Sequence, residues 1–139
     1  MILAIRISGQ VEIPEKVSET LRRLRIHRKY SAVLVQPTTQ NIKLLKHLRD
    51  YIAFGDITPE TLKLLIEKRA VPIDKSKKVN AESVIAELEK KPLSKTSIKP
   101  FFRLHPPIGG LNTKDHFPVK RGVLGDNKEK INDLVRRML

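Results

Sequence analysis

The chain has no cysteine and no tryptophan, and aromatic residues make up only 4% of its 139 residues. Without cysteine it forms no disulfide and no thiolate metal site. No apolar run approaches the roughly 20 residues that cross a bilayer, and the apolar start is broken at Arg6, too soon for a signal peptide. We therefore expect a cytoplasmic protein with no membrane segment.

Acidic residues are scarce relative to basic ones. The chain carries 28 Lys and Arg against 15 Asp and Glu, a formal net charge of +13. The excess is spread evenly, with 13 basic and 7 acidic residues in residues 1–70 and 15 and 8 in residues 71–139. Because a polyanion relieves such self-repulsion, the first partner to expect is a structured nucleic acid, above all RNA.

Apolar periodicity predicts a β-α-β-α-β core in residues 1–57. The pattern alternates in the first strand, as in a half-buried strand, and is apolar on both faces in the second. The three strands are expected at residues 2–8, 32–35 and 51–55. Pro14 suits the first position of one helix, and Thr38 or Thr39 can cap the next.

Residues 58–139 are predicted to form an extension packed on this core. Thr58 and Asn80 can each cap a helix, and a C-terminal helix is expected from Asp126, which forms a capping-box spacing with Glu129. Between them, residues 92–125 hold five of the nine prolines and four of the six glycines. We expect a mobile loop there that docks on the core where Phe101 and Phe102 stand together.

The strongest chemical signal lies where the first helix passes into the second strand. The candidate RNA-binding residues of this segment are Arg22, Arg23, Arg25, His27, Arg28, Lys29 and Tyr30. No acidic residue stands among them, and the planar guanidinium group suits phosphate contact and stacking on bases. The alternative is a solvated helix end whose cations complement the helix dipole.

Two further groups complete the candidate RNA-binding set. The second helix contributes Lys43, Lys46, His47 and Arg49, and the Pro/Gly-rich loop contributes Arg103, His105, Gly109, Gly110, Lys120 and Arg121. Paired prolines stiffen one half of the loop, while paired glycines let the other half approach a partner closely. The alternatives are an ordinary surface helix and a connector that only covers the core.

Catalytic and metal-binding interpretations find little support in the sequence. No paired carboxylates stand out, and the four histidines do not follow a metal-ligand spacing. His105 and His116 are the one candidate acid–base pair, for RNA cleavage. We therefore expect no enzyme activity, no cofactor, no metal and no small-molecule substrate.

Three segments are distinctive: residues 24–35, the basic turn into the second strand; residues 50–55, with Tyr-Ile-Ala-Phe-Gly; and residues 131–138, the C-terminal helix. They resemble the corresponding segments of the large-subunit ribosomal proteins called L thirty in bacteria and archaea and L seven in eukaryotes. The Pro-Pro-x-Gly-Gly loop agrees as well, although Ile108 stands where we expect many relatives to carry a basic residue.

The resemblance implies an α+β fold with a small three-stranded antiparallel sheet, the first strand central and helices on one face. It also implies a ribosomal, non-catalytic protein of translation whose partners are large-subunit ribosomal RNA and other large-subunit proteins. A chain that starts at the first strand and carries a C-terminal extension resembles the archaeal members. The alternative function is a small nucleoid protein that coats duplex DNA and gives the Pro/Gly-rich loop no role.

Overall fold

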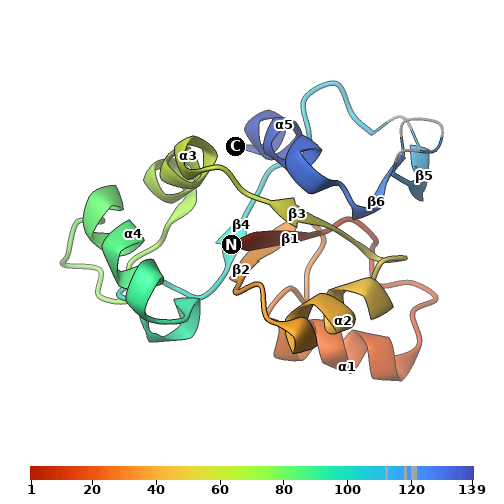
Figure 1. The fold of residues 1–139 in the computed structure, drawn as a ribbon, viewed down its shortest axis with the longest axis horizontal. Helices are drawn as coiled ribbons and strands as arrows, with labels where there is room; N and C mark the ends of the chain where they lie inside the picture. The colour runs from red at the N-terminus through yellow and green to blue at the C-terminus, as the bar shows by residue number, and fades with distance from the viewer. Residues whose placement is uncertain (112, 118, 120–121) are drawn as a thin grey trace.

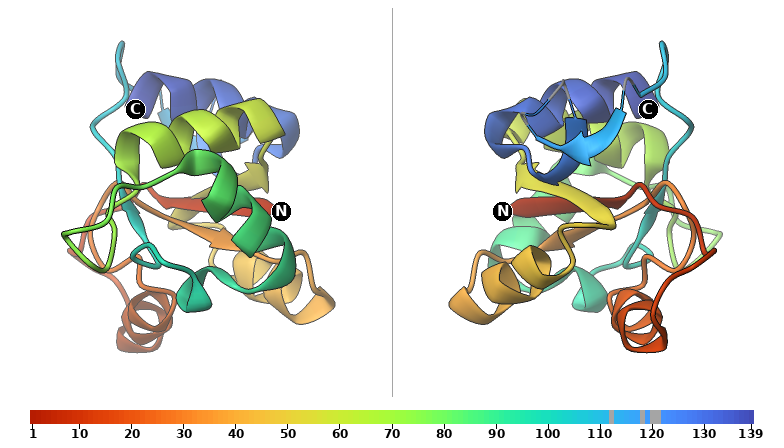
Figure 2. Two further views of the ribbon diagram at one scale, coloured as in Figure 1. Left: turned by 90° about the vertical axis from the view of Figure 1, so that its left-hand side faces the viewer. Right: turned by 90° about the vertical axis from the view of Figure 1, so that its right-hand side faces the viewer.

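A computed structural model of the chain describes residues 1–111, 113–117, 119 and 122–139. The candidate residues Lys120 and Arg121 therefore lie outside the described residues. In the described residues, six strands form one mixed sheet in the order β4-β2-β1-β3-β6-β5. Helices lie against both faces of this sheet, with α1 and α2 on one side and α3 and α5 on the other (Figures 1 and 2).

The centre of the sheet is built by β1 (Ile2–Arg6), β2 (Ser31–Val35) and β3 (Ile52–Asp56). β1 pairs antiparallel with both neighbours, so Leu3 lies opposite Leu34 on one side and Gly55 on the other. This confirms that the first strand is central. Every residue of β1 is buried, so the expectation of a half-buried first strand is wrong. The reason is that helices cover both faces.

The sheet is larger than the predicted three-stranded antiparallel one. It gains β4 (Phe102–Arg103), β5 (Thr113–His116) and β6 (Gly122–Asp126), all from the expected loop. β4 pairs antiparallel with β2, whereas β6 pairs parallel with β3 and β5 parallel with β6. Residues 92–125 are thus not one long loop, because strand pairing with the core satisfies much of their backbone.

The helices beneath the sheet in Figure 1 are α1 (Glu15–Arg23) and α2 (Thr39–His47). Thr38 caps α2 as predicted, with its side chain accepting from the Asn41 amide at 3.3 Å. Pro14 occupies the N-cap position of α1, one residue before the predicted place. Leu45 and Leu48 turn the apolar side of α2 into the core.

The helices of the extension are α3 (Pro59–Arg69), α4 (Ala81–Lys90) and α5 (Ile131–Met138), with short 3₁₀ turns η1 (Leu93–Lys95) and η3 (Lys128–Lys130). Thr58 and Asn80 cap α3 and α4 as predicted. The C-terminal helix begins five residues later than expected, because Asp126 ends β6. The Asp126 carboxylate instead accepts from the Lys128 amide at 3.0 Å.

α5 packs closely on β3 and covers the second face of the sheet. A Cβ on Gly55 would lie 2.3 Å from the Lys128 carbonyl oxygen, so only glycine permits this approach. The Asn132 amide donates to the Asp56 carbonyl at 3.1 Å, and its oxygen accepts from the Thr58 amide at 2.9 Å. The expectation of helices on one face only is therefore wrong.

The Pro-Pro-x-Gly-Gly loop closes the C-terminal end of α5. The His105 amide donates to the Met138 carbonyl and the Ile108 amide to the Arg137 carbonyl, both at 2.9 Å. The Arg137 guanidinium in turn donates to the Gly110 carbonyl at 2.8 Å. These bonds satisfy carbonyls that a helix end leaves without partners. Gly109 and Gly110, with φ of 81° and 70°, allow the chain to turn here.

Candidate nucleic-acid interface

The basic segment, Arg22–Tyr30, begins in the last turn of α1, where the helix stops tightly. The Arg25 amide donates to the Arg22 carbonyl at 2.9 Å, and the Ile26 amide to the Leu21 carbonyl at 3.1 Å. This is the pair of bonds of a Schellman motif, in which glycine normally takes the left-handed position. Here that position belongs to Arg25, with φ of 64°. Ile26 and Leu21 are both fully buried and hold the turn on the core.

A second non-glycine residue with left-handed backbone ends the segment. Tyr30 has φ of 62°; its amide donates to the Arg6 carbonyl at 2.8 Å and its carbonyl accepts from the Leu104 amide at 3.0 Å. Each such residue costs on the order of 1–2 kcal/mol. Strain of this kind persists where neighbouring structure enforces it, and it gathers at functional sites. The backbone between Arg25 and Tyr30 is therefore fixed from both ends.

The buried side chain of Arg6 binds the backbone of the same segment from inside the core. Its side chain is 1% exposed, and its guanidinium donates to the Ser8 and Gly9 carbonyls at 3.0 Å, to the Ile26 carbonyl at 3.3 Å and to the His27 carbonyl. Burial lowers the pKa of this group from its usual value, because the charged form loses water. Arg6 thus ties the chain after β1 to the basic segment.

Arg6 was not predicted as part of the site. Alternation placed it on the polar face of a half-buried strand, and the one available signal was a charged residue inside an apolar run. A buried guanidinium needs hydrogen-bond acceptors on several sides. Those acceptors come from two loops that are distant in the sequence, so periodicity alone cannot find them.

The basic segment and the chain leading into β4 enclose a hollow of about 290 Å³. The residues lining this β2–β4 hollow are Arg25, His27, Arg28, Ser31, Pro100, Phe101 and Arg103. Neither aspartate nor glutamate occurs in this lining, as far as the described residues go. The Arg103 guanidinium carbon lies 5.9 Å from the centroid of the Phe101 ring. The structure thus brings Arg103 of the extension to three of the candidates of the basic segment.

The other candidates of the basic segment lie outside the hollow. Arg22, Arg23 and Lys29 are exposed, and the Lys29 ammonium sits 5.0 Å from the centroid of the half-buried Tyr30 ring. Arg23 pairs with Glu19, one helical turn earlier, at 2.6 Å. The expectation that these cations have no acidic partner is therefore wrong for Arg23. One helical turn places it beside Glu19, which lies just before the segment.

The second-helix candidates lie on α2 or, in the case of Arg49, just after its end. Lys43, Lys46, His47 and Arg49 are all exposed, but none of them lines the β2–β4 hollow. Arg49 is close to β6, its Cβ 3.9 Å from where a Cβ on Gly125 would lie. Both views of Figure 2 show α1 and α2 apart beneath the sheet. The four residues therefore do not line the hollow that the basic segment forms, although Asn41 of α2 lies with Arg23 and Arg25 around a neighbouring hollow.

The loop candidates divide in the same way. Arg103 lines the hollow, whereas His105, Gly109 and Gly110 belong to the turn that closes α5. All three are exposed, and so is Ile108, at 78%. His116, the proposed partner of His105 in an acid–base pair, instead contacts Asp50 at 2.8 Å on the β5 side. No contact between the two histidines is seen in the described part of the chain.

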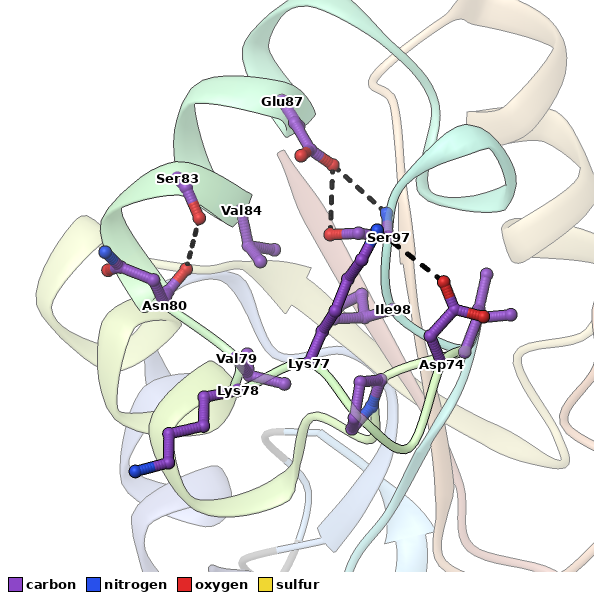
Figure 3. A pocket seen from close by; sticks show the side chains of 12 residues that line it. Asp74, Lys77, Lys78, Val79, Asn80, Ser83, Val84, Glu87, Ser97 and Ile98 are labelled. Atoms are coloured by element: carbon purple, nitrogen blue, oxygen red, sulfur yellow. Dashed lines mark hydrogen bonds and ion pairs between the residues drawn. The ribbon is translucent and has the colours of Figure 1, made fainter.

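A larger hollow, of about 470 Å³, lies between the α3–α4 connection and the segment before β4 (Figure 3). Its polar groups already bind one another: Glu87 accepts from the Ser97 amide and hydroxyl at 3.1 and 3.3 Å, and Lys77 lies 3.7 Å from Asp74. Because these partners are satisfied internally, this hollow has fewer free groups for a ligand than the β2–β4 hollow.

Metal and membrane sites do not emerge from the geometry. Within the described ranges, no three His, Cys, Asp or Glu side chains gather where they could hold a metal ion. None of the described helices is long and apolar enough to cross a membrane.

Known proteins match the chain over nearly its whole length. The family model described as Ribosomal protein L30p/L7e matches residues 2–52. The chain is 36% identical to the large ribosomal subunit protein uL30 of Archaeoglobus fulgidus, over 99% of both chains. It is 36% identical to that of Nanoarchaeum equitans over 96% of both, and 32% identical to that of Methanococcus maripaludis over 97% of both. These matches confirm the resemblance seen in the sequence, and the chain belongs to the family of large ribosomal subunit protein uL30.

Proposed function

We propose that this protein binds folded large-subunit ribosomal RNA, with the β2–β4 hollow as its principal contact. The observation that carries the proposal is the fixed arrangement of Arg25, Arg28 and Arg103 around one concave surface without acidic residues among its described lining. The guanidinium fork binds phosphate oxygens in pairs, so three of them in one place suit a bend or junction of the RNA backbone.

Affinity on this mechanism comes from displaced counterions, and specificity comes from shape. Each phosphate contact makes log K fall by roughly 0.7–0.9 for each tenfold rise in salt. The left-handed residues Arg25 and Tyr30 and the buried Arg6 hold the spacing of the cations before RNA arrives. A preformed surface loses little conformational entropy on binding, so it favours the one RNA fold that matches it.

We further propose that the exposed cations of α2 contact a second segment of RNA. Lys43 and Lys46 of α2 and Arg49 just after it are exposed, as is the His47 imidazole, and none of them lines the hollow. A protein that touches two RNA segments with separate surfaces holds them at a fixed distance. This is the action expected of a structural component of the large ribosomal subunit.

The division into an RNA-binding core, residues 1–57, and an extension, residues 58–139, also stays a proposal. The extension contributes β4 and β6 to the sheet beside β2 and β3. It also supplies Phe101 and Arg103 to the hollow. On this proposal the core positions most of the cations, and the extension completes the binding surface.

Filter binding to purified large-subunit ribosomal RNA across a salt series tests the proposal. Replacing Arg25, Arg28 and Arg103 with alanine should weaken binding and reduce the slope of log K against log salt by about 2 to 3. The matched control replaces Lys75, Lys78 and Lys91, exposed lysines outside the hollow, and should change binding far less.

Two results would contradict the proposal. One is binding that does not depend on salt; the other is equal weakening in the two triple variants, which would reduce the interaction to net charge. A competition with unrelated duplex DNA addresses the nucleoid alternative. Competition as effective as that of ribosomal RNA would favour that alternative.

A further inference from the structure

We infer that the β2–β4 hollow binds one unpaired RNA base, which stacks on Phe101 while the arginines hold its flanking phosphates. The inference deepens the proposed function and rests on it. It assigns a role to an aromatic side chain that neither the charge pattern nor the family resemblance singles out. It also names the class of RNA that this surface recognises, a strand with a base extruded from its helix.

The position of Phe101 is the first observation. Consecutive side chains of an extended strand point to opposite faces. Phe102, in β4, is fully buried in the core, so Phe101 faces the hollow, where it stays partly exposed. The pair of phenylalanines thus divides into one that docks on the core, as predicted, and one left accessible beside the arginines.

The surroundings of the ring are the second observation. Arg103 lies 5.9 Å from its centroid, and Arg25 and Arg28 line the same hollow. Stacking on an aromatic ring, with arginine for the adjoining phosphates, is how proteins commonly bind single-stranded nucleic acid. Ser31 also lines the hollow but is only 4% exposed, so the exposed His27 is the residue whose ring can meet the edge of a base, in place of its 3.5 Å contact with the Gln10 side-chain nitrogen.

The size of the hollow limits what it can hold. Its 290 Å³ lies just below the range of ligand sites, which measure about 300–1,000 Å³. It suits one base rather than a dinucleotide. A fully paired RNA helix offers it no base face, because its bases are stacked on one another and its major groove is too deep and narrow to enter.

The experiment measures binding of two RNA hairpins that differ only in one bulged 2-aminopurine. The wild type should bind the bulged hairpin about 5- to 150-fold more tightly, the range that one stacked base provides. The fluorescence of the bulged base should fall on binding. Phe101→Leu should abolish both the preference and the quenching while leaving the salt slope unchanged, and Phe101→Tyr should retain them.

Phe117→Leu is the matched control, because Phe117 is half-buried and lies outside the hollow. It should behave as the wild type, and thermal unfolding should show that Phe101→Leu is folded. Equal affinity of the wild type for the two hairpins, together with salt-dependent binding to ribosomal RNA, would overturn the base site but leave the proposed function standing. Failure to bind ribosomal RNA would overturn both.

Discussion

The cations of the β2–β4 hollow and those of α2 are alike in exposure but differ in what fixes them. Around the hollow, backbone turns with positive φ and a buried guanidinium set the positions from which the arginines project. On α2, Lys43 and Lys46 stand on a regular helix face, and the lysine ammonium is carried on a flexible four-carbon stem. The first arrangement suits recognition of one RNA shape, and the second suits a non-specific electrostatic contact.

The largest effect is expected from Arg6→Met, which removes the support of the hollow and leaves α2 untouched. Four carbonyl oxygens, those of Ser8, Gly9, Ile26 and His27, would lose their donor. The bond to Ile26 is buried and the other three are partly buried. A buried unsatisfied group costs about 1–3 kcal/mol and a partly hydrated one costs less, so the free energy of unfolding should fall by about 3 kcal/mol. Urea denaturation measures this free energy. A decrease of less than about 1 kcal/mol would show that Arg6 does not support the site.

The next effect comes from paired substitutions that remove equal charge from the two surfaces. Arg28→Ala with Arg103→Ala should weaken binding to ribosomal RNA at least about 150-fold, because charge-assisted hydrogen bonds contribute about 1.5–3 kcal/mol each. Lys43→Ala with Lys46→Ala should weaken it only about 5-fold, as for exposed charges worth up to about 1 kcal/mol. Equal losses in the two variants would remove the distinction between the surfaces.

A smaller effect, with opposite signs in two measurements, is expected from Arg25→Gly. Glycine takes the left-handed conformation without strain, so the free energy of unfolding should rise by about 1 kcal/mol. RNA affinity should nevertheless fall several-fold, because the hollow loses a cation. Thermal unfolding and filter binding on the same sample separate the effect on stability from the effect on RNA affinity. Loss of stability would show that the Arg25 side chain supports the fold.

The smallest effect is expected from Arg23→Ala. Arg23 is exposed, paired with Glu19 and outside the β2–β4 hollow. Its replacement should change the free energy of unfolding by less than about 0.5 kcal/mol and leave RNA affinity close to that of the wild type. A loss as large as that of Arg28→Ala alone would mean that the binding surface extends along α1.

Membership of the uL30 family confirms two sequence-based expectations besides the family itself: the chain is a ribosomal protein of the large subunit, and it is not an enzyme. The basis for the second was the lack of any arrangement of titratable residues with a catalytic spacing. In the structure the two histidines of the one proposed pair have different partners: the His105 amide donates to the Met138 carbonyl, and His116 contacts Asp50.

The central strands and most helix caps were predictable because their causes are local. Alternating or continuous apolar residues and a capping Thr or Asn lie next to the elements that they specify. β4 and β6 could not be found in this way. The first has two residues, and the second reads Gly-Val-Leu-Gly-Asp, without alternation. Each becomes a strand because a partner distant in the sequence, β2 or β3, supplies its hydrogen bonds.

The candidate site likewise has features that the sequence identified and features that only the structure decided. The sequence alone identified Arg25, His27, Arg28 and Arg103 as candidate RNA ligands, since charge density and residue type are visible in one dimension. Only the tertiary structure decided which of them meet, that Arg6 fastens their backbone from inside the core, and that Phe101 faces them while Phe102 is buried. The physical reason is that charge belongs to single residues, whereas a concave surface exists only where segments distant in the sequence pack together.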